Sequence, residues 1–111
     1  MAGREHLGEF EQIVLLAILR LGDDAYGVPI RIEIETRTRR TVTVGAIYRT
    51  LDRLEAKGYV TSWFGEPTAT RGGRSRRYFK LRALGLRTLR ASRDVLAAMW
   101  EGLEPETPHG S

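Results

Sequence analysis

One segment of the chain carries basic side chains at helical spacing, and their chemistry suits recognition of phosphates and base edges. Arg49, Arg53 and Lys57 recur at every fourth position, which puts them on one face of a helix. Arginine donates paired hydrogen bonds to phosphate oxygens and to guanine in the major groove of DNA. The segment therefore predicts a helix whose basic face can meet DNA, with Arg49 at base edges and Arg53 at a base or a phosphate.

The same helix has an apolar face and two marked ends. Four apolar residues fall in one narrow sector of the helix and can pack on a core: Val44, Ile47, Leu51 and Leu54. Thr43 is the expected N-cap, and Gly58 is expected to end the helix in a left-handed conformation. Gly45 and Ala46 keep the first turn narrow enough to approach base edges. Taken alone, the segment fits an ordinary amphipathic surface helix equally well.

The residues after this helix favour the DNA interpretation. Residues 59–64 are β-branched or aromatic, residues 65–73 are rich in glycine, and residues 74–81 combine arginines with aromatic positions. Two strands joined by a loop fit this pattern. A helix followed by a basic hairpin is the arrangement of a winged helix, whose arginines can enter the minor groove or grip its phosphates. Arg71, Arg74 and Arg76 are therefore candidate DNA contacts, the alternative being a solvated loop tip.

Three runs of the chain together resemble the PadR family of bacterial transcriptional regulators, over roughly residues 8–90. They are Ala25-Tyr26-Gly27, the run from Gly45 to Val60 and the run from Gly73 to Leu81. The third run is similar to the family's Gly-Arg-x-x-(Arg/Lys)-Tyr-Tyr strand. Members commonly carry a threonine cap where the last helix starts, whereas this chain has Arg82-Ala83-Leu84-Gly85. The resemblance implies a winged helix-turn-helix protein that regulates transcription.

The candidate DNA-binding residues come from both the helix and the hairpin: Thr43, Gly45, Ala46, Tyr48, Arg49, Arg53, Arg71, Arg74 and Arg76. The resemblance suggests that the Tyr48 hydroxyl contacts phosphate or base, and a structural tyrosine between helix and hairpin is an equal alternative. Arg77 alternates with Arg76 along the strand, so it should face the other way and pair with an acid. The resemblance also implies that Tyr26 is buried at the start of the second helix, with its hydroxyl bonded to the backbone.

The N-terminal half supplies two further helices. Residues 8–21 are apolar around almost the whole circumference, so one side should pack in the core and another against a partner subunit. Residues 30–35 alternate like a half-buried strand, but we predict a helix because Pro29 suits a first turn and two i,i+4 ion pairs are available. These pairs are Glu33 with Arg37 and Glu35 with Arg39. Residues 39–42 should then form a short β-like bridge to the DNA-reading helix.

Residues 84–103 form a last helix that the core of so small a domain cannot cover. Leu89, Leu96 and Leu103 repeat every seven residues and form an apolar seam. We therefore expect a dimerisation helix, and the resemblance implies that it packs with the first helix of the other subunit. A two-fold dimer would present its two DNA-reading helices about 34 Å apart to successive major grooves, which predicts a pseudo-palindromic binding site.

Leu96, Met99 and Trp100 form a candidate ligand-binding set on this last helix. Some PadR relatives bind flat hydrophobic ligands at the dimer interface, against aromatic residues of this helix. The resemblance thus implies a small hydrophobic or aromatic effector. The alternative is that Trp100 simply fills the interface, where aromatic residues and methionine are common.

Composition limits the other classes of protein. The chain has 111 residues, 41% hydrophobic content and no cysteine, which fits one small domain without disulfides or zinc–thiolate sites. Its net charge is +4, but residues 67–93 hold eight arginines, one lysine and no acid, a segment that suits a polyanion. The sequence shows neither a signal-peptide pattern nor an apolar stretch long enough for a bilayer, so we expect a cytoplasmic protein without a membrane partner.

Two chemical functions and two binding functions compete with DNA recognition. Catalysis would need a base or nucleophile in a pocket, yet the only histidines, His6 and His109, lie near the termini. We therefore expect that the protein is not an enzyme and that it has neither a cofactor nor a metal site. An RNA-binding protein stays an alternative, because Arg71-Gly72-Gly73-Arg74 is similar to arginine–glycine segments. A winged-helix module that binds another protein is the second alternative.

The sequence thus predicts a mainly α protein with a small β-hairpin. We expect a winged helix-turn-helix domain at residues 8–82, a dimerisation helix at residues 83–104 and flexible tails at residues 1–7 and 105–111. The expected function is that of a homodimeric repressor that binds double-stranded DNA and is released by a hydrophobic ligand. No pattern in the sequence specifies the operator, the effector, the regulated genes or the choice between repression and activation.

Overall fold

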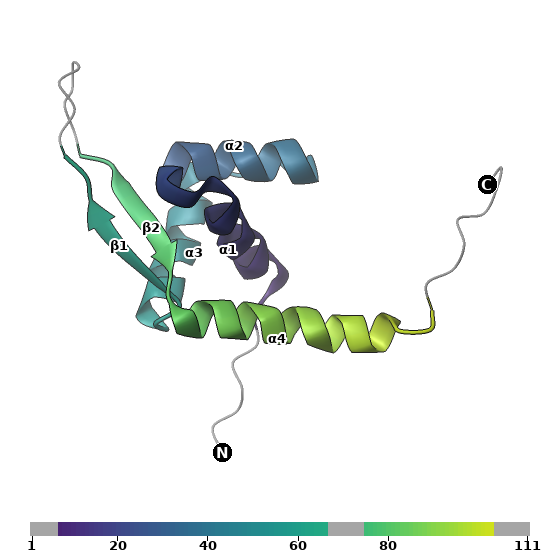
Figure 1. Cartoon of the computed structure of the whole chain (residues 1–111). Helices are drawn as coiled ribbons and strands as arrows, with labels where there is room; N and C mark the ends of the chain where they lie inside the picture. Colours follow the sequence, from purple (N-terminus) through teal and green to yellow (C-terminus); the bar gives the residue numbers. More distant parts are fainter. Residues whose placement is uncertain (1–6, 67–74, 104–111) are drawn as a thin grey trace.

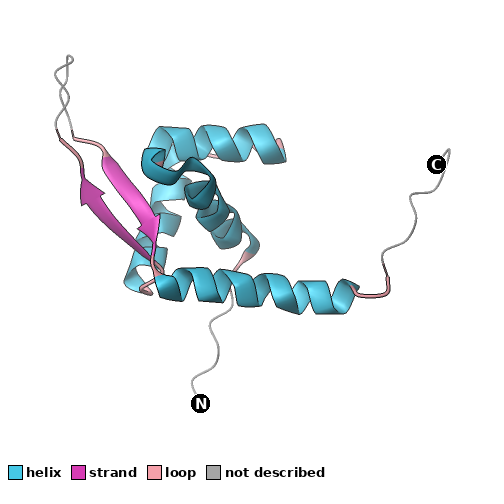
Figure 2. Cartoon of the chain, viewed as in Figure 1, coloured by secondary structure: helices cyan, strands magenta, loops and turns pink. Residues whose placement is uncertain are grey.

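Four α-helices and a two-stranded antiparallel sheet form the fold of residues 7–66 and 75–103, the part of the chain that the computed structural model describes (Figures 1 and 2). The elements are α1 (Glu9–Leu21), the 3-10 turn η1 (Gly22–Asp24), α2 (Gly27–Thr38), α3 (Val44–Ala56), β1 (Val60–Phe64), β2 (Arg77–Leu81) and α4 (Ala83–Trp100). The predicted fold class, mainly α with a hairpin, is confirmed. No helix of these residues has the length and apolarity to cross a bilayer.

Local chemistry explains where α3 begins and ends. The hydroxyl oxygen of Thr43 accepts a hydrogen bond from the backbone N–H of Ala46 at 3.0 Å, so Thr43 is the N-cap that the sequence predicts. After the helix, Gly58 has a φ of +83°, a conformation that residues with a Cβ adopt at a cost. Both ends of the predicted DNA-reading helix are therefore confirmed.

The helical prediction for α2 is confirmed, although only one of its two expected ion pairs forms. Arg37 pairs with Glu33 as predicted. The carboxylate of Glu35 instead pairs with Arg31 at 3.4 Å and accepts a hydrogen bond from the backbone N–H of Val42 at 3.0 Å. The expected pairing of Glu35 with Arg39 is therefore wrong.

The β-like bridge predicted for residues 39–42 is also wrong. Arg39 caps α2 in the left-handed conformation, with a φ of +61°, and the residues that follow form a loop. That backbone turn and the capture of the Val42 N–H by Glu35 keep the segment from pairing with a strand. The hairpin pairs instead with Tyr26, which forms an isolated bridge with Tyr78, and the N–H of Phe79 donates to the carbonyl of Ala25 at 2.9 Å.

The core lies where α1, α2, α3 and the base of the hairpin meet (Figure 1). The largest fully buried side chains come from all of these elements: Val14, Leu15, Ile30, Ile34, Ile47, Leu51, Leu54, Val60 and Phe79. Full burial of each such side chain contributes about 1.5–3 kcal/mol. The apolar face predicted for α3 is thus the face that packs, and its opposite face is left for solvent or a ligand.

The last helix, α4, joins this core only through its first half. Leu89 is buried, and Gly85 lies so close to the residue before β1 that a Cβ added there would come within 2.2 Å of the Tyr59 carbonyl oxygen. Beyond Leu89 the helix runs past the rest of the molecule (Figure 1). It ends at Trp100, where the prediction continued to Leu103. The chain turns at Gly102, with a φ of +82°, so Leu103 does not extend the heptad seam.

The residues at the predicted tails lie mostly outside the described part of the chain. Leu7 is an exception: its side chain is buried in the core beside α1. The histidines His6 and His109, and the loop residues Arg71 and Arg74, are outside the described residues.

Candidate nucleic-acid interface

The exposed side of α3 has the geometry of a surface that can enter a groove. Gly45 and Arg49 are exposed on its first turns, opposite the fully buried Ile47. A Cβ at Gly45 would lie 3.5 Å from an Arg49 guanidinium nitrogen, so the arginine side chain reaches back over the first turn. Ala46, half-buried beside them, adds no bulk. The predicted placement of these three residues at the exposed N-terminal end is what the structure shows.

Thr43 sits at the tip of this surface. Its hydroxyl oxygen is occupied by the Ala46 N–H, and its side chain is exposed. A hydroxyl that accepts one hydrogen bond still has a proton to donate, so the cap can also bond to an acceptor on a ligand.

Tyr48 has a structural role that its sequence position alone leaves open. Its ring packs on Phe79, with 6.2 Å between the ring centroids, and it is half-buried. Its hydroxyl lies against Gly27, where an added Cβ would come within 2.6 Å of the hydroxyl oxygen. The tyrosine therefore fills the space between α3, α2 and the hairpin. This contact also explains why α2 begins with a glycine, which the sequence pattern alone does not predict.

Arg53, predicted to face DNA, lies beside an acid from α1. Its Nε is 3.8 Å from a carboxylate oxygen of Glu11, and one of its terminal nitrogens donates to the Thr50 hydroxyl at 3.3 Å. Glu11 is 8% exposed and also accepts hydrogen bonds from the Gly8 N–H at 2.9 Å and from Lys57 Nζ at 3.4 Å. Arg53 is still 56% exposed, so it can contact DNA only while sharing its charge with Glu11.

Arg76 and three aromatic rings lie on one face of the hairpin. The Arg76 guanidinium carbon is 4.7 Å from the centre of the Tyr26 ring, a cation–π contact. Tyr26 contacts Tyr78 at 5.3 Å between centroids, and Tyr78 stacks on Trp63 at 6.0 Å with 17° between the planes. The prediction for Tyr26 needs correction: it is half-buried, and its ring contacts carry its interactions in place of the expected hydroxyl–backbone bond.

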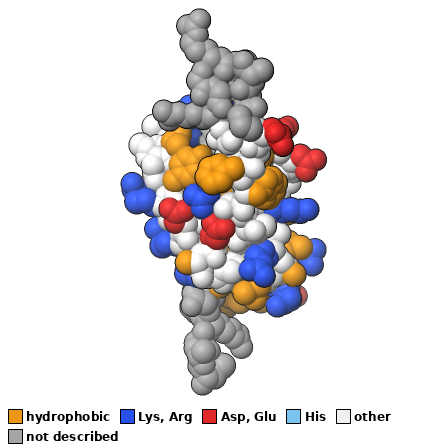
Figure 3. All heavy atoms as spheres, turned by 90° about the vertical axis from the view of Figure 1, so that its left-hand side faces the viewer, with side chains coloured by type: hydrophobic (Ala, Val, Ile, Leu, Met, Phe, Trp, Pro, Cys, Tyr) orange, Lys and Arg blue, Asp and Glu red, His pale blue; other side chains and the backbone are white. Residues whose placement is uncertain are grey.

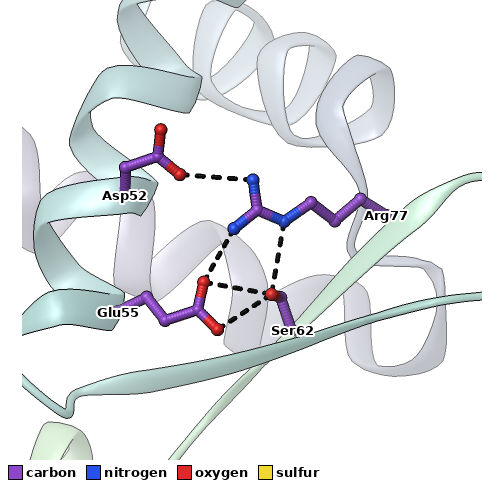
Figure 4. Close-up of polar contacts among 4 residues, drawn as sticks. All are labelled: Asp52, Glu55, Ser62 and Arg77. Atoms are coloured by element: carbon purple, nitrogen blue, oxygen red, sulfur yellow. Dashed lines mark hydrogen bonds and ion pairs between the residues drawn. The ribbon is translucent and has the colours of Figure 1, made fainter.

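Arg77 points from the other face of the same strand toward α3 (Figure 4). Its guanidinium contacts the carboxylates of Asp52 at 3.2 Å and Glu55 at 2.7 Å. Its Nε donates to the Ser62 hydroxyl at 3.2 Å. The prediction that Arg77 pairs with an acid is confirmed. The sequence did not name the partners, although Asp52 and Glu55 are three residues apart and therefore share one flank of the helix.

Viewed from the hairpin side, the molecular surface shows a group of hydrophobic side chains surrounded by basic and acidic ones (Figure 3). Phe64 and Trp63 of β1 are exposed, Phe64 to 69%. Exposed aromatic rings beside arginines can stack on bases or pack against sugar edges, whereas exposed carboxylates repel phosphates.

Comparison with known proteins decides between the candidate classes. The family model described as "Transcriptional regulator PadR-like family" matches residues 15–91, a stretch that contains α2, α3 and both strands. The chain belongs to the PadR-like family of transcriptional regulators. It is therefore a DNA-binding regulator with the winged helix-turn-helix fold that the sequence resemblance implies.

Solved structures support the fold of this PadR-like chain. A transcriptional regulator from Clostridium thermocellum is 23% identical, with a TM-score of 0.68 and 84% of each chain covered. A PadR family regulator from Clostridium difficile R20291 is 22% identical, with a TM-score of 0.66 over 86% of this chain and 99% of that one. A PadR-like regulator from Bacillus cereus is 21% identical, with a TM-score of 0.64 over 87% and 93%. A search of curated proteins found no significant match.

The candidate ligand-binding residues of this PadR-like regulator lie on the unpacked half of α4. Leu96, Met99 and Trp100 are all exposed, Met99 to 72% and Trp100 to 57%. Leu96 lines a groove that continues to Leu7 and Tyr59, whereas Trp100 borders an open depression near the end of the helix. A single chain thus does not enclose the three side chains. Among the described residues there is no cluster of three or more metal-ligating side chains.

Proposed function

We propose that this PadR-like regulator acts as a homodimeric repressor, which reads a pseudo-palindromic operator with α3 and releases it when a hydrophobic ligand binds at the subunit interface. The main support for this proposal is that one side of α3 is buried and the other is exposed. Ile47, Leu51 and Leu54 are fully buried on one side, while Gly45 and Arg49 stand exposed on the other. No catalytic role is part of the proposal.

The major-groove contacts are assigned to the N-terminal half of α3. A recognition helix reads bases through its first residues, and Gly45 and Ala46 let its backbone approach while Arg49 reaches a guanine edge. The exposed Thr43 hydroxyl, and the half-buried Tyr48 on the flank of the helix, are assigned to phosphates or sugars nearby. Arg53 is assigned to a phosphate, because its contact with Glu11 draws it away from the first turn.

The hairpin contacts are assigned to Arg76 together with Arg71 and Arg74, the latter two outside the described residues. Arg76 is exposed and held by the Tyr26 ring, which orients the guanidinium without consuming its hydrogen-bond donors. Arginines of this kind are suited to a narrow minor groove and its phosphates.

Dimerisation is supported by the apolar surface that one chain leaves open. The exposed large apolar residues of α4 and α1 are Leu84, Val95, Leu96, Met99, Trp100, Leu16 and Leu19. So many large apolar side chains on so small a chain favour a second copy as their cover. A two-fold axis would then set the two α3 helices about 34 Å apart and require a pseudo-palindromic operator.

Ligand release is assigned to Leu96, Met99 and Trp100 at that interface. A flat hydrophobic molecule could stack on Trp100, and it would release DNA only if it prefers a dimer geometry in which the two α3 helices no longer match successive grooves. Simple filling of the interface by Trp100 is the competing role. In a Trp63→Phe variant, where Trp100 is the remaining tryptophan, saturable quenching of its fluorescence by an added flat ligand would support the ligand role, and no quenching would support simple filling.

Fluorescence-anisotropy titration tests the proposal. The labelled duplex comes from upstream of the protein's own gene, with a scrambled duplex and a structured RNA as competitors at two salt concentrations. We expect tighter binding to the upstream duplex, two chains per site and a steep loss of affinity with salt. Equal binding to all three nucleic acids would favour a general RNA- or DNA-binding protein. Absence of binding would favour a protein-interaction module.

A further inference from the structure

Arg77 joins three elements through one side chain (Figure 4). Its three guanidinium nitrogens contact Asp52 and Glu55 on α3, at 3.2 Å and 2.7 Å, and Ser62 on β1, at 3.2 Å. The Ser62 hydroxyl also lies 2.9 and 3.0 Å from the two Glu55 carboxylate oxygens. A flat guanidinium with donors in a fixed fork suits such a junction, because each bond restricts the direction of the others.

The same guanidinium is unsuited to a phosphate. All three of its nitrogens already have protein acceptors, and its carbon lies 4.9 Å from the centre of the Phe79 ring. The side chain is 26% exposed. Each of its nitrogens directs one N–H at a protein acceptor, so a phosphate that took these N–H groups would compete with two carboxylates.

The junction lies between the two surfaces assigned to DNA. Arg49 is on α3 one turn before Asp52, and Arg76 precedes Arg77 on the hairpin but faces the other side of the strand. The outer edge of β2 is held by the Phe79 N–H, which donates to the Ala25 carbonyl, and by the isolated bridge between Tyr78 and Tyr26. The Arg77 contacts hold the edge that faces α3, so the angle between α3 and the hairpin depends on them.

We propose that Arg77 is a positioning residue for DNA binding: by bridging Asp52, Glu55 and Ser62 it fixes the hairpin against α3, so that Arg76 and Arg49 engage one duplex together. This role rests on the proposed function of α3 and the hairpin in DNA binding. Asp52 and Glu55 are part of the same device, although their charges alone would repel DNA.

Two substitutions separate positioning from simple electrostatics. Arg77→Lys keeps the positive charge but cannot reach all three partners. Glu55→Ala raises the net charge of the chain by one unit, so electrostatic attraction alone predicts tighter DNA binding. Positioning predicts that both variants bind the upstream duplex about fivefold to twentyfold more weakly than the natural chain, the usual range for coupled contacting residues.

Asp23→Asn is the charge-matched control for Glu55→Ala. Asp23 is exposed on η1 beside Trp63 and Lys80, on the face of the hairpin opposite Arg77, and its loss adds the same charge. We expect this control to bind as tightly as the natural chain or slightly more tightly. Circular dichroism and thermal melts establish that each variant is folded at the titration temperature. If Arg77→Lys or Glu55→Ala does not fold, Ser62→Ala removes only the bridging hydroxyl and should weaken binding by about twofold to threefold.

A double-substitution cycle with Arg76→Ala gives a readout that loss of stability alone would not move. In the natural chain Arg76→Ala should weaken binding about fivefold, and in the Glu55→Ala background it should weaken binding less than twofold, because a hairpin that is no longer held makes little use of Arg76. Equal effects of Arg76→Ala in both backgrounds, or natural affinity of Arg77→Lys, would overturn the positioning role. Failure of the natural chain itself to prefer the upstream duplex would instead contradict the proposed function on which this role rests.

Discussion

Arg49 is exposed on α3, and its guanidinium lies beside Gly45, which has no side chain to obstruct it. Arg53 and Lys57 contact Glu11, whereas the Arg49 guanidinium lies over Gly45 at the open end of the helix. This difference supports the proposal that Arg49 contacts base edges, while the more C-terminal pair contacts phosphates or stabilises the fold. The candidate site is therefore narrower than a count of basic residues on the helix face suggests.

Arg49→Ala should remove sequence preference and leave dimerisation unchanged. A bidentate contact to guanine is worth about 1–3 kcal/mol of discrimination, so the ratio of affinities for the upstream and scrambled duplexes should fall by about fivefold to 150-fold. Competition anisotropy gives this ratio, and gel filtration checks the oligomeric state. A variant that kept its preference would place the reading face elsewhere on α3.

Gly45→Ala should separate folding from DNA binding at a second position. The new Cβ would meet an Arg49 nitrogen at 3.5 Å and the Thr43 hydroxyl oxygen at 4.0 Å, both ordinary contact distances. Alanine favours a helix by about 0.5–1 kcal/mol over glycine. We expect unchanged or higher thermal stability together with weaker binding to the upstream duplex, because the methyl group stands where the helix approaches the base edges. Natural affinity in a folded variant would show that the first turn does not enter the groove.

At the scale of elements, the parts that were predicted correctly depend on neighbours in sequence. The Thr43 cap, the Gly58 terminus and the buried Ile47 face of α3 all follow from residues within a few turns. The same is true of the two strands. The pairing face of Arg77 follows from simple alternation.

The features that escaped prediction depend on contacts between elements. The fit of Gly27 under the Tyr48 hydroxyl joins α2 to α3, and the contact of Glu11 with Arg53 joins α1 to α3. Residues 39–42 look β-like because of Thr41 and Val42, but Glu35 from α2 captures the Val42 N–H. In each case the deciding partner is distant or off the pattern, so spacing alone could not reveal it.

The contact of α4 with Tyr59, the residue before β1, is the clearest contact between elements to test. Gly85→Ala would bring a Cβ within 2.2 Å of the Tyr59 carbonyl oxygen, so α4 must move away from the core. We expect a loss of about 1–3 kcal/mol in the free energy of unfolding, measured by urea denaturation. Gly45→Ala is the matched control, since the same change there meets no backbone. Equal stability of the two variants would contradict the close packing of α4.

At the scale of the whole molecule, we propose that the exposed half of α4 joins two chains into a dimer. Leu96→Glu should convert the dimer to a monomer, because a carboxylate buried in an apolar interface without a partner is strongly unfavourable. Ala98→Glu adds the same charge on the other side of the helix and should leave the dimer intact. Sedimentation equilibrium reports both. A dimer that tolerates Leu96→Glu would mean that another surface joins the two chains.

The proposed dimer places its two α3 helices in successive major grooves, and hydroxyl-radical footprinting of the upstream duplex measures the spacing and symmetry of these two contacts. We expect two protected patches on one face of the duplex, about 10 base pairs apart and related by two-fold symmetry. Arg49→Ala should lose both patches together. A single protected patch, or two patches with no symmetry between them, would contradict a two-fold dimer that places two α3 helices on the duplex.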